Sequence, residues 1–367
     1  MKPQIFSLEE LQIPAEPEEL SATMEIIAGL GSLQFEAGVS VQHQSLVKLK
    51  TRRRDLTEHA CAHSVFFCQV LLQTRQALQM SRGFHVGVIG GGYLGKQLVR
   101  CLLDLTDLHA DDISVSTRRP ETLRDLQGRG VKCFYDNVKL VRGAHIVFLC
   151  CLPSQLPAVC AEIRGHLPEW CVVYSLVSAV PLPRVTGLLG HSGVIRPEYQ
   201  CDPKDDGPQC HHHGSLTKAL KDGSLVRATI PGELWDGECD NCVLHPGGVC
   251  IVSHFMEPVL YAVLNLCTSH DLSHDQAVSI LNGLIQQRVT SGESPVGAGF
   301  TSANFVSKAF LASLSADSRF PRFDLSSVQM KETPLSQHLA GSAHLRTQLS
   351  SLYCTIFHTD TQRVHLS

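Results

Sequence analysis

The sequence lacks any uncharged apolar run of about 18 residues, the minimum for a helix that crosses a membrane. It also lacks a secretory signal and an Arg-rich transit peptide, because its first residues include the acidic side chains of Glu9, Glu10 and Glu16. The sequence also lacks an excess of positive charge, since the formal net charge is −4. These absences predict a protein that neither spans a membrane nor is a dedicated nucleic-acid binder.

Charged residues make up 18% of the chain, below the usual quarter, whereas 43% are hydrophobic. This balance is typical of a folded protein with ordinary cores rather than of a disordered chain. A length of 367 residues allows two domains and additional segments. The basic run Arg52–Arg54 is followed at once by Asp55, and we interpret it as a solvated face or a loop rather than a phosphate-binding stripe.

The sequence contains 15 cysteines, an odd number. Several lie inside apolar segments, as Cys150, Cys151 and Cys171 do, where a reduced thiol behaves as a small hydrophobe. We therefore expect a reducing compartment and a cytoplasmic location. Neighbouring residues of a strand point to opposite faces, so Cys150 and Cys151 are interpreted as core thiols and not as a redox pair.

Short apolar segments alternate with helical patterns between residues 84 and 200. The expected strands are 84–89, 113–116, 131–134, 145–150, 171–177 and 193–196. Helical patterns over 94–105 and 120–127 lie between the first three, and alternation at this spacing predicts βαβ units. The expected fold class is α/β, a doubly wound parallel (Rossmann) sheet followed by a mostly helical C-terminal domain.

Four parts are expected along the chain. Residues 1–83 form an N-terminal extension, partly disordered and then helical from His59 to Met80, and residues 84–200 form the Rossmann domain. Residues 201–248 form an irregular excursion or linker. Residues 249–367 form the helical C-terminal domain, with helical patterns that begin near Pro258, at a capping-box pattern of Ser273 and Gln276, over 303–314 and over 336–357.

A glycine loop follows the first expected strand at once, with the sequence Gly90-Gly91-Gly92-Tyr93-Leu94-Gly95. Gly90 permits a tight turn, Gly92 lets the backbone approach a pyrophosphate, and Gly95 lets the next helix pack on the strand. The start of that helix then offers N–H groups to the phosphates. The motif alone is weak evidence, but its place between a strand and a helix predicts a dinucleotide site that includes Tyr93 and Leu94.

The end of the second strand distinguishes NADP from NAD. An NAD-binding domain places Asp or Glu about 20 residues after the loop, where the carboxylate accepts a hydrogen bond from the ribose 2′-hydroxyl. Here the strand ends in two hydroxyl and two guanidinium side chains, Ser116, Thr117, Arg118 and Arg119. Since arginine pairs bidentately with a phosphate, these residues favour NADP(H) over NAD(H).

Together with these motifs, the sequence resembles the pyrroline-5-carboxylate reductase family. The similarity is carried by Val86–Gly95, by Ser116–Pro120, which matches a Ser/Thr-Arg-x-Pro pattern, by Cys150–Gln155, by Tyr174–Val180 and by Val194–Arg196. It covers residues 84–200 well and 247–285 loosely. The resemblance implies that Cys151, Leu152 and Pro153 line the nicotinamide side of the site, and that the helical part forms a homodimer.

The sequence also departs from that family. Leu152 stands where the family has lysine, and Pro197-Glu198-Tyr199 follows Arg196 in place of a Met-Pro-Asn or Met-Thr-Asn segment. The family's late Thr-Ser-Pro-Gly-Gly-Thr-Thr segment has no good match, for which Ser294–Gly297 is a poor substitute. The resemblance therefore supports NADP(H) binding by this chain, but it does not support pyrroline-5-carboxylate as the substrate.

Two functions from different classes fit these observations. The first is an NADP(H)-dependent oxidoreductase that transfers hydride to a small imine or carbonyl substrate. Tyr199 and Glu198 follow the sixth strand and are weak candidates for its proton donor, with ordinary loop residues as the alternative. The second is a non-catalytic NADP(H)-binding protein with a lost substrate site, which the departures favour.

A zinc site is the remaining possibility. Cysteines and histidines gather in the excursion, at Cys201, Cys210, His211–His213, Cys239, Cys242 and His245. Cys239 and Cys242 have ligand spacing, but no second Cys-x-x-Cys or His pair at zinc-ligand spacing accompanies them. We therefore expect no metal here and interpret the segment as a polar excursion.

Overall fold

The structure is a computed structural model that describes residues 41–80, 83–201, 215–234, 249–251, 254–286 and 299–357. The chain divides into two units, Met1–Thr51 with His211–His213, and Arg52–Cys210 with Gly214–Ser367. Of the first unit only the beginning of helix α2 (Val41–Ala77) is described.

The second unit contains a six-stranded parallel sheet in the order β3-β2-β1-β4-β5-β6. The strands are β1 (Val86–Ile89), β2 (Ile113–Ser116), β3 (Lys132–Phe134), β4 (Ile146–Leu149), β5 (Val172–Ser175) and β6 (Val194–Ile195). β1 pairs with both β2 and β4, so Ile89 lies opposite Ser116 and Leu149. The strand order reverses between β1 and β4, and this is the doubly wound Rossmann fold that the sequence predicts.

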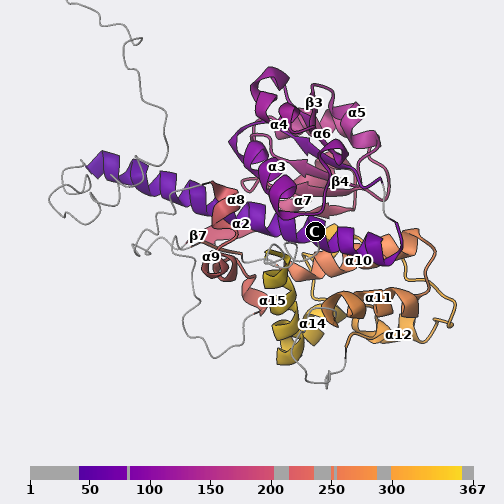
Figure 1. Ribbon diagram of the computed structural model, residues 1–367. Helices are drawn as coiled ribbons and strands as arrows, with labels where there is room; N and C mark the ends of the chain where they lie inside the picture. Colours follow the sequence, from indigo (N-terminus) through magenta and orange to yellow (C-terminus); the bar gives the residue numbers. More distant parts are fainter. Residues whose placement is uncertain are drawn as a thin grey trace, which may run out of the picture. The chain divides into compact units, whose positions relative to one another are not determined.

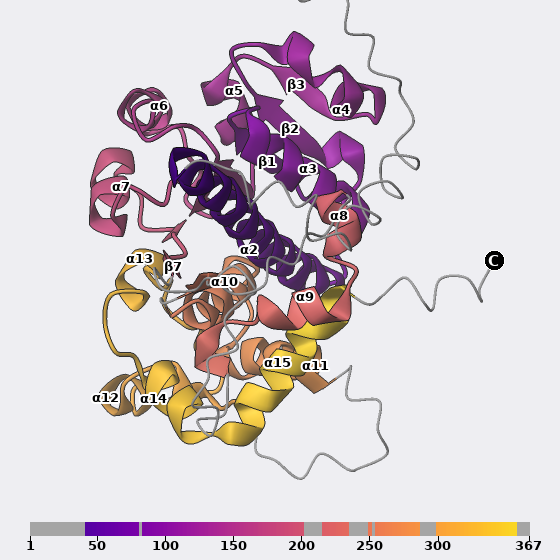
Figure 2. The ribbon, with the colours of Figure 1, turned by 90° about the vertical axis from the view of Figure 1, so that its left-hand side faces the viewer.

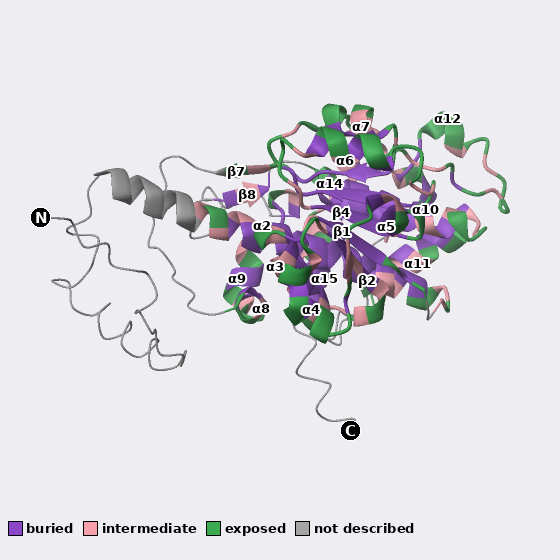
Figure 3. Cartoon of the chain, turned by 90° about the horizontal axis from the view of Figure 1, so that it is seen from above, coloured by how far each residue is buried: buried purple, intermediate pink, exposed green. Residues whose placement is uncertain are grey.

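Side chains alternate between the two faces of the sheet, as the pleat requires. Val88 packs in the core under helix α3 (Tyr93–Leu105), while Ile89 and Leu149 pack in the core on the opposite face. That opposite face is covered by α5 (Asn137–Arg142), α6 (Leu156–Ile163) and α7 (Leu182–Leu189). Figure 3 shows β1 and β4 buried, whereas α7 carries an exposed outer face.

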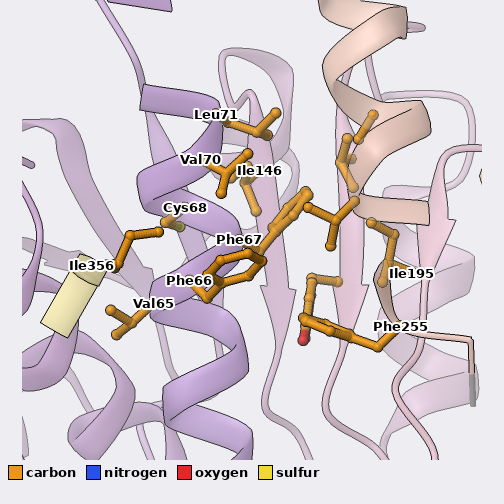
Figure 4. Close-up of a cluster of buried hydrophobic side chains, with 14 of the residues drawn as sticks. Val65, Phe66, Phe67, Cys68, Val70, Leu71, Ile146, Ile195, Phe255 and Ile356 are labelled. Atoms are coloured by element: carbon orange, nitrogen blue, oxygen red, sulfur yellow. The ribbon is translucent and has the colours of Figure 1, made fainter. Parts of the chain in front are cut away.

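Helix α2 passes between the sheet and the helical C-terminal part, as both Figure 1 and Figure 2 show. Its middle is buried on all sides, with Val65, Phe66 and Phe67 fully inaccessible to solvent. The Phe67 ring lies 5.5 Å from that of Tyr174 on β5, and the Phe66 ring lies 4.8 Å from that of Tyr353. Figure 4 shows this stretch of α2 with Ile146, Ile195 and Phe255 on one side and Ile356 on the other. The N-terminal helix is therefore part of the core that joins sheet and helices.

The C-terminal part is mostly helical. Its helices are α10 (Met256–Ser269), α11 (His274–Gln286), α12 (Lys308–Leu311), α13 (Leu325–Val328), α14 (Pro334–Gly341) and α15 (Ala343–Phe357), with η5 (Ser302–Asn304) between α11 and α12. The predicted capping box before α11 is confirmed: Ser273 N donates to Gln276 Oε1 at 3.0 Å, and Gln276 N donates to Ser273 Oγ at 3.4 Å.

Several local elements differ from the sequence predictions. The excursion 201–248 contains α8 (Leu216–Ala219), α9 (Gly223–Ala228) and η4 (Gly232–Leu234), because Ser215 and Asp222 accept hydrogen bonds at the helix starts. Residues 199–201 form β7 (Tyr199–Cys201), which pairs antiparallel with β8 (Val249–Ile251). The expected helix over 303–314 is replaced by η5 and α12. Across the described residues, no helix has the length and apolar character needed to cross a bilayer.

Candidate dinucleotide-binding site

The candidate site lies at the carboxyl edge of the parallel sheet, where strand ends bring the predicted residues together. Exposed apolar side chains also gather there. Of the six large hydrophobic side chains that are exposed in the described part of the chain, Tyr93, Tyr135 and Leu152 follow β1, β3 and β4 respectively. An apolar surface beside a polar loop is typical of a ligand-binding site.

The glycine loop has the geometry that the sequence predicts. Gly90 adopts φ +112°, a conformation that other residues rarely reach. A Cβ at Gly95 would lie 2.0 Å from the Gly90 carbonyl oxygen, so only glycine lets α3 approach the strand this closely. A Cβ at Gly92 would meet nothing within 4 Å, which leaves its outer side open to a ligand. These positions fit a loop whose backbone a pyrophosphate can approach.

Two further residues of this region were not predicted from the sequence. Gly91 is buried, and a Cβ there would lie 3.0 Å from Thr117 and Leu123 side-chain atoms, so the loop packs tightly on its neighbours. The Arg53 guanidinium lies over the Tyr93 ring, 4.3 Å from the ring centre. The run Arg52–Arg54 is part of helix α2 and not a loop, and its Arg53 side chain lies at the start of α3. The basic run Arg52–Arg54 was the feature of the sequence that could have indicated this contact.

The residues at the end of β2 are of two kinds: two form hydrogen bonds within the fold, and two are exposed. Ser116 is buried, and its Oγ accepts a hydrogen bond from Asp136 N at 3.2 Å, so this hydroxyl helps to hold the end of β3. Thr117 N donates to Phe134 O at 2.9 Å. Arg118 and Arg119 are exposed, and within the described residues no hydrogen bond or ion pair engages their guanidinium groups. The two arginines are therefore free to meet an anionic ligand.

The end of β4 places its cysteines on opposite faces of the sheet, as predicted. Cys150 packs against the core that contains α2 and α3, and Cys151 packs against the core of the other face. Burial raises the pKa of both thiols, which makes them poor nucleophiles. Leu152 and Pro153 follow as exposed residues at the carboxyl edge. Their contact with a nicotinamide ring stays a prediction.

The two candidate proton donors have different surroundings. Glu198 is exposed, and its carboxylate lies 3.8 Å from the Arg196 guanidinium. Tyr199 lies on β7, where its hydroxyl is 3.0 Å from Nδ1 of the fully buried His63 on α2. His63 Nε2 is 2.8 Å from the Thr229 carbonyl oxygen, so Nε2 carries the proton and Tyr199 donates to Nδ1. The Tyr199 hydroxyl is thus engaged in an internal network.

This network predicts a specific pH dependence of stability. Burial lowers the pKa of His63 to about 4, from an ordinary value near 6.5, so the folded state holds a neutral imidazole. Below the ordinary value, the unfolded chain binds a proton that the folded chain does not. We therefore expect the contribution of His63 to the free energy of unfolding to fall by roughly 2–3 kcal/mol as the pH drops through the window between about 6.5 and 4.

Urea unfolding of the wild type and of His63→Gln between about pH 7 and pH 4 measures this contribution. Glutamine does not titrate, so the loss of stability at low pH should be smaller in the variant by the amount given above. The carboxylates and His145, whose pKa burial also lowers to about 4, contribute equally in both proteins. The difference between the two proteins in how the free energy of unfolding changes with pH therefore reports on His63 alone. Parallel pH curves for the two proteins would contradict a neutral buried His63.

Two cavities lie away from the glycine loop. One of about 250 Å³ is lined by residues at the amino ends of strands, such as Phe84, His145 and Cys171, and by residues of α2 and α10. Another of about 500 Å³ lies beside it, between the end of α2 and the loop after α3. Both are at the edge of the sheet opposite the loop, and the candidate dinucleotide site does not rest on them. The cysteines and histidines that were weighed and set aside as zinc ligands, other than Cys201, lie outside the described residues, and so does Ser294–Gly297.

Comparison with known proteins agrees with this arrangement. Residues 85–177 match the family described as NADP oxidoreductase coenzyme F420-dependent. The mouse NADP-dependent oxidoreductase domain-containing protein 1 is 37% identical over 357 residues, which cover 91% of this chain and 94% of the mouse protein. The chain belongs to the family of that mouse protein.

This family is a divergent relative of the pyrroline-5-carboxylate reductases, which confirms the resemblance seen in the sequence. Mouse pyrroline-5-carboxylate reductase 3 is 22% identical over 229 residues, covering 60% of this chain and 82% of the reductase. A solved pyrroline-5-carboxylate reductase from Coxiella burnetii aligns at 17% identity and a TM-score of 0.32, over 75% of this chain and 97% of its own. The chain is thus a member of an oxidoreductase family with a Rossmann domain, and its strand order establishes the fold.

Proposed function

We propose that this protein is an NADP(H)-dependent oxidoreductase that reduces a small imine or carbonyl compound. The observation that carries the proposal is the glycine loop, with its open Gly92 beside two unengaged arginines at the end of β2. The NADP-dependent relative, which is similar over nearly its whole length, supports the same cofactor. When bound, the nicotinamide supplies the hydride, and the protein supplies binding, orientation and exclusion of water.

Each part of the carboxyl edge has a proposed role toward the cofactor. The backbone of Gly90, Gly92 and Gly95 and the start of α3 at Tyr93 and Leu94 hold the pyrophosphate. Thr117, Arg118 and Arg119 hold the 2′-phosphate, with Ser116 as their structural support, and this preference for a phosphate favours NADP(H) over NAD(H). Cys151, Leu152 and Pro153 lie beneath the nicotinamide.

The two candidate proton donors, Glu198 and Tyr199, differ in what their side chains contact. Glu198 is exposed beyond β6, where a carboxyl group can reach a bound substrate. Tyr199 donates its hydroxyl hydrogen to the buried His63, so we assign it a structural role instead. This engagement of Tyr199 and the presence of Leu152 in place of lysine favour the second candidate function, a non-catalytic NADP(H)-binding protein.

The remaining proposals concern organisation and location. We place the Rossmann domain at residues 84–200 and the helical C-terminal domain at 249–367, with the helical domain covering the cofactor and forming a homodimer. We place the protein in the cytoplasm, because buried cysteines such as Cys61, Cys68 and Cys171 are free thiols that lie in its cores.

Turnover assays separate the two candidate functions. Purified full-length protein is mixed with NADPH and a panel of cyclic imines and small ketones, and oxidation of NADPH is followed by absorbance. The proposal predicts saturable oxidation with at least one compound, lost on substitution of the glycine loop. Tight NADPH binding without turnover across the panel would instead support the non-catalytic protein.

Arg53 supplies a further prediction about the same site. Since its guanidinium lies over Tyr93 at the start of α3, we expect it to reach the pyrophosphate, which NADPH and NADH share. Arg53→Ala should therefore weaken both cofactors equally, by about tenfold. Calorimetric Kd values measure the effect, with Arg142→Ala, an exposed arginine on α5, as the matched control. Affinities within about twofold of the wild type would remove Arg53 from the site.

A further inference from the structure

Glu233, His254 and Glu257 bring three metal-binding groups together in the helical part of the chain. Glu233 lies in η4, and Glu257 lies in the first turn of α10, just after His254. One ligand atom from each residue lies within 4.8 Å of the other two. Ligands on opposite sides of a six-coordinate ion are about 4 Å apart. Small side-chain rotations would therefore close this group around a cation.

Each carboxylate is held through one oxygen and presents the other to the histidine. Met256 N donates to Glu233 Oε1 at 2.5 Å, and Thr333 Oγ1 donates to Glu257 Oε2 at 2.6 Å. The remaining oxygens, Glu233 Oε2 and Glu257 Oε1, lie 3.8 Å and 3.0 Å from His254 Nδ1. Outer hydrogen bonds of this kind orient metal ligands, so the three groups converge with their free atoms inward.

The charges of this group are poorly compensated. Glu257 is fully buried, and no hydrogen bond reaches its Oε1, although His254 Nδ1 is near. Within the described residues, no lysine or arginine forms an ion pair with either carboxylate. Glu257 is buried and the Glu233 side chain is only 20% exposed, and two carboxylates this close to one another are stabilised by a cation between them.

We propose that Glu233, His254 and Glu257 bind a first-row divalent transition cation of the Mn²⁺, Fe²⁺ or Zn²⁺ type. Carboxylate oxygen and imidazole nitrogen are ligands that these ions accept. The His254 side chain is 51% exposed, which leaves an entry path and room for water ligands. The bound ion would tie η4 to the start of α10 and stabilise the fold. None of these three residues is among those assigned to the cofactor, and the proposal does not depend on the proposed reaction.

Manganese alone is the best probe, because Mn²⁺ disfavours thiolate ligands and so discriminates against the cysteines of residues 201–248. Full-length protein is freed of metal by chelation and titrated with Mn²⁺, while electron paramagnetic resonance follows the free ion. We expect one bound ion per chain in the wild type and a Kd at least about tenfold weaker in Glu257→Gln. Glu121→Gln, at an exposed carboxylate of η3, is the matched control and should bind as the wild type does.

Thermal unfolding distinguishes a variant that has lost the metal site from one that has lost its fold. Glutamine is close to glutamate in shape and removes a buried charge, so Glu257→Gln should fold, and Mn²⁺ should raise the Tm of the wild type but not of the variant. His254→Asn, at a half-exposed side chain, provides a second variant with little risk to folding and should also bind at least about tenfold more weakly. No Mn²⁺ binding by the wild type, or equal Kd values in wild type and both variants, would overturn the proposal.

Discussion

Replacing Gly95 with alanine is expected to lower the free energy of unfolding by about 3–5 kcal/mol and to abolish NADPH binding. The added Cβ would lie 2.0 Å from the Gly90 carbonyl oxygen and 3.5 Å from Cys150 Cβ. Because the first contact is with backbone, no side-chain rotation relieves it, and α3 must move away from β1. Urea unfolding measures the stability, and calorimetry measures the NADPH affinity.

Gly92→Ala is the matched comparison for this variant. A Cβ at Gly92 meets nothing within 4 Å, and its φ of −75° suits alanine, so the stability should stay within about 0.5 kcal/mol of the wild type. If a pyrophosphate lies against the loop, the same methyl group should nevertheless weaken NADPH binding. A stable Gly95→Ala protein, or a Gly92→Ala protein with unchanged NADPH affinity, would contradict the roles assigned to these glycines.

Replacing Arg118 and Arg119 together with alanine is expected to weaken NADPH binding by between about 10²- and 10⁴-fold, because two charge-assisted contacts are worth roughly 3–6 kcal/mol. NADH lacks the 2′-phosphate, so its affinity should change by less than about threefold. Both side chains are exposed and unengaged in the described structure, so the stability should stay within about 0.5 kcal/mol.

Arg184→Ala provides the control for the general loss of positive charge. Arg184 is also exposed, but it lies on α7, on the face of the sheet away from α3. Its removal should leave both cofactor affinities unchanged. If the double variant loses NADPH and NADH equally, the two arginines contact the pyrophosphate or nothing specific, and the assignment of the 2′-phosphate site is wrong.

Much of the parallel sheet could be predicted from the sequence, because its signals are local. Short apolar runs bounded by turn residues indicate buried strands, as in Ile146–Leu149, and the glycine loop follows β1 without a gap. The φ of Gly90 and the close approach at Gly95 are consequences of that local pattern. The opposite orientation of Cys150 and Cys151 follows from the strand period alone.

The features that were missed depend on contacts between distant segments. Tyr199 was expected at the ligand edge, but its hydroxyl pairs with His63, which is 136 residues away in the sequence. Arg53 is exposed, in agreement with a solvated face, but nothing near it in sequence shows that it lies over Tyr93. His254 and Glu257 are three residues apart, but nothing in the sequence shows that Glu233, from a separate segment, lies beside them.

Comparison of NADPH and NADH binding to the full-length protein tests the central claim most directly. Calorimetric titrations at one ionic strength measure both Kd values, since phosphate contacts depend on salt. The structure's exposed arginine pair and open glycine loop predict that NADPH binds at least about tenfold more tightly than NADH. Equal or tighter binding of NADH would contradict the NADP(H) assignment, and failure of both cofactors to bind would contradict the dinucleotide site itself.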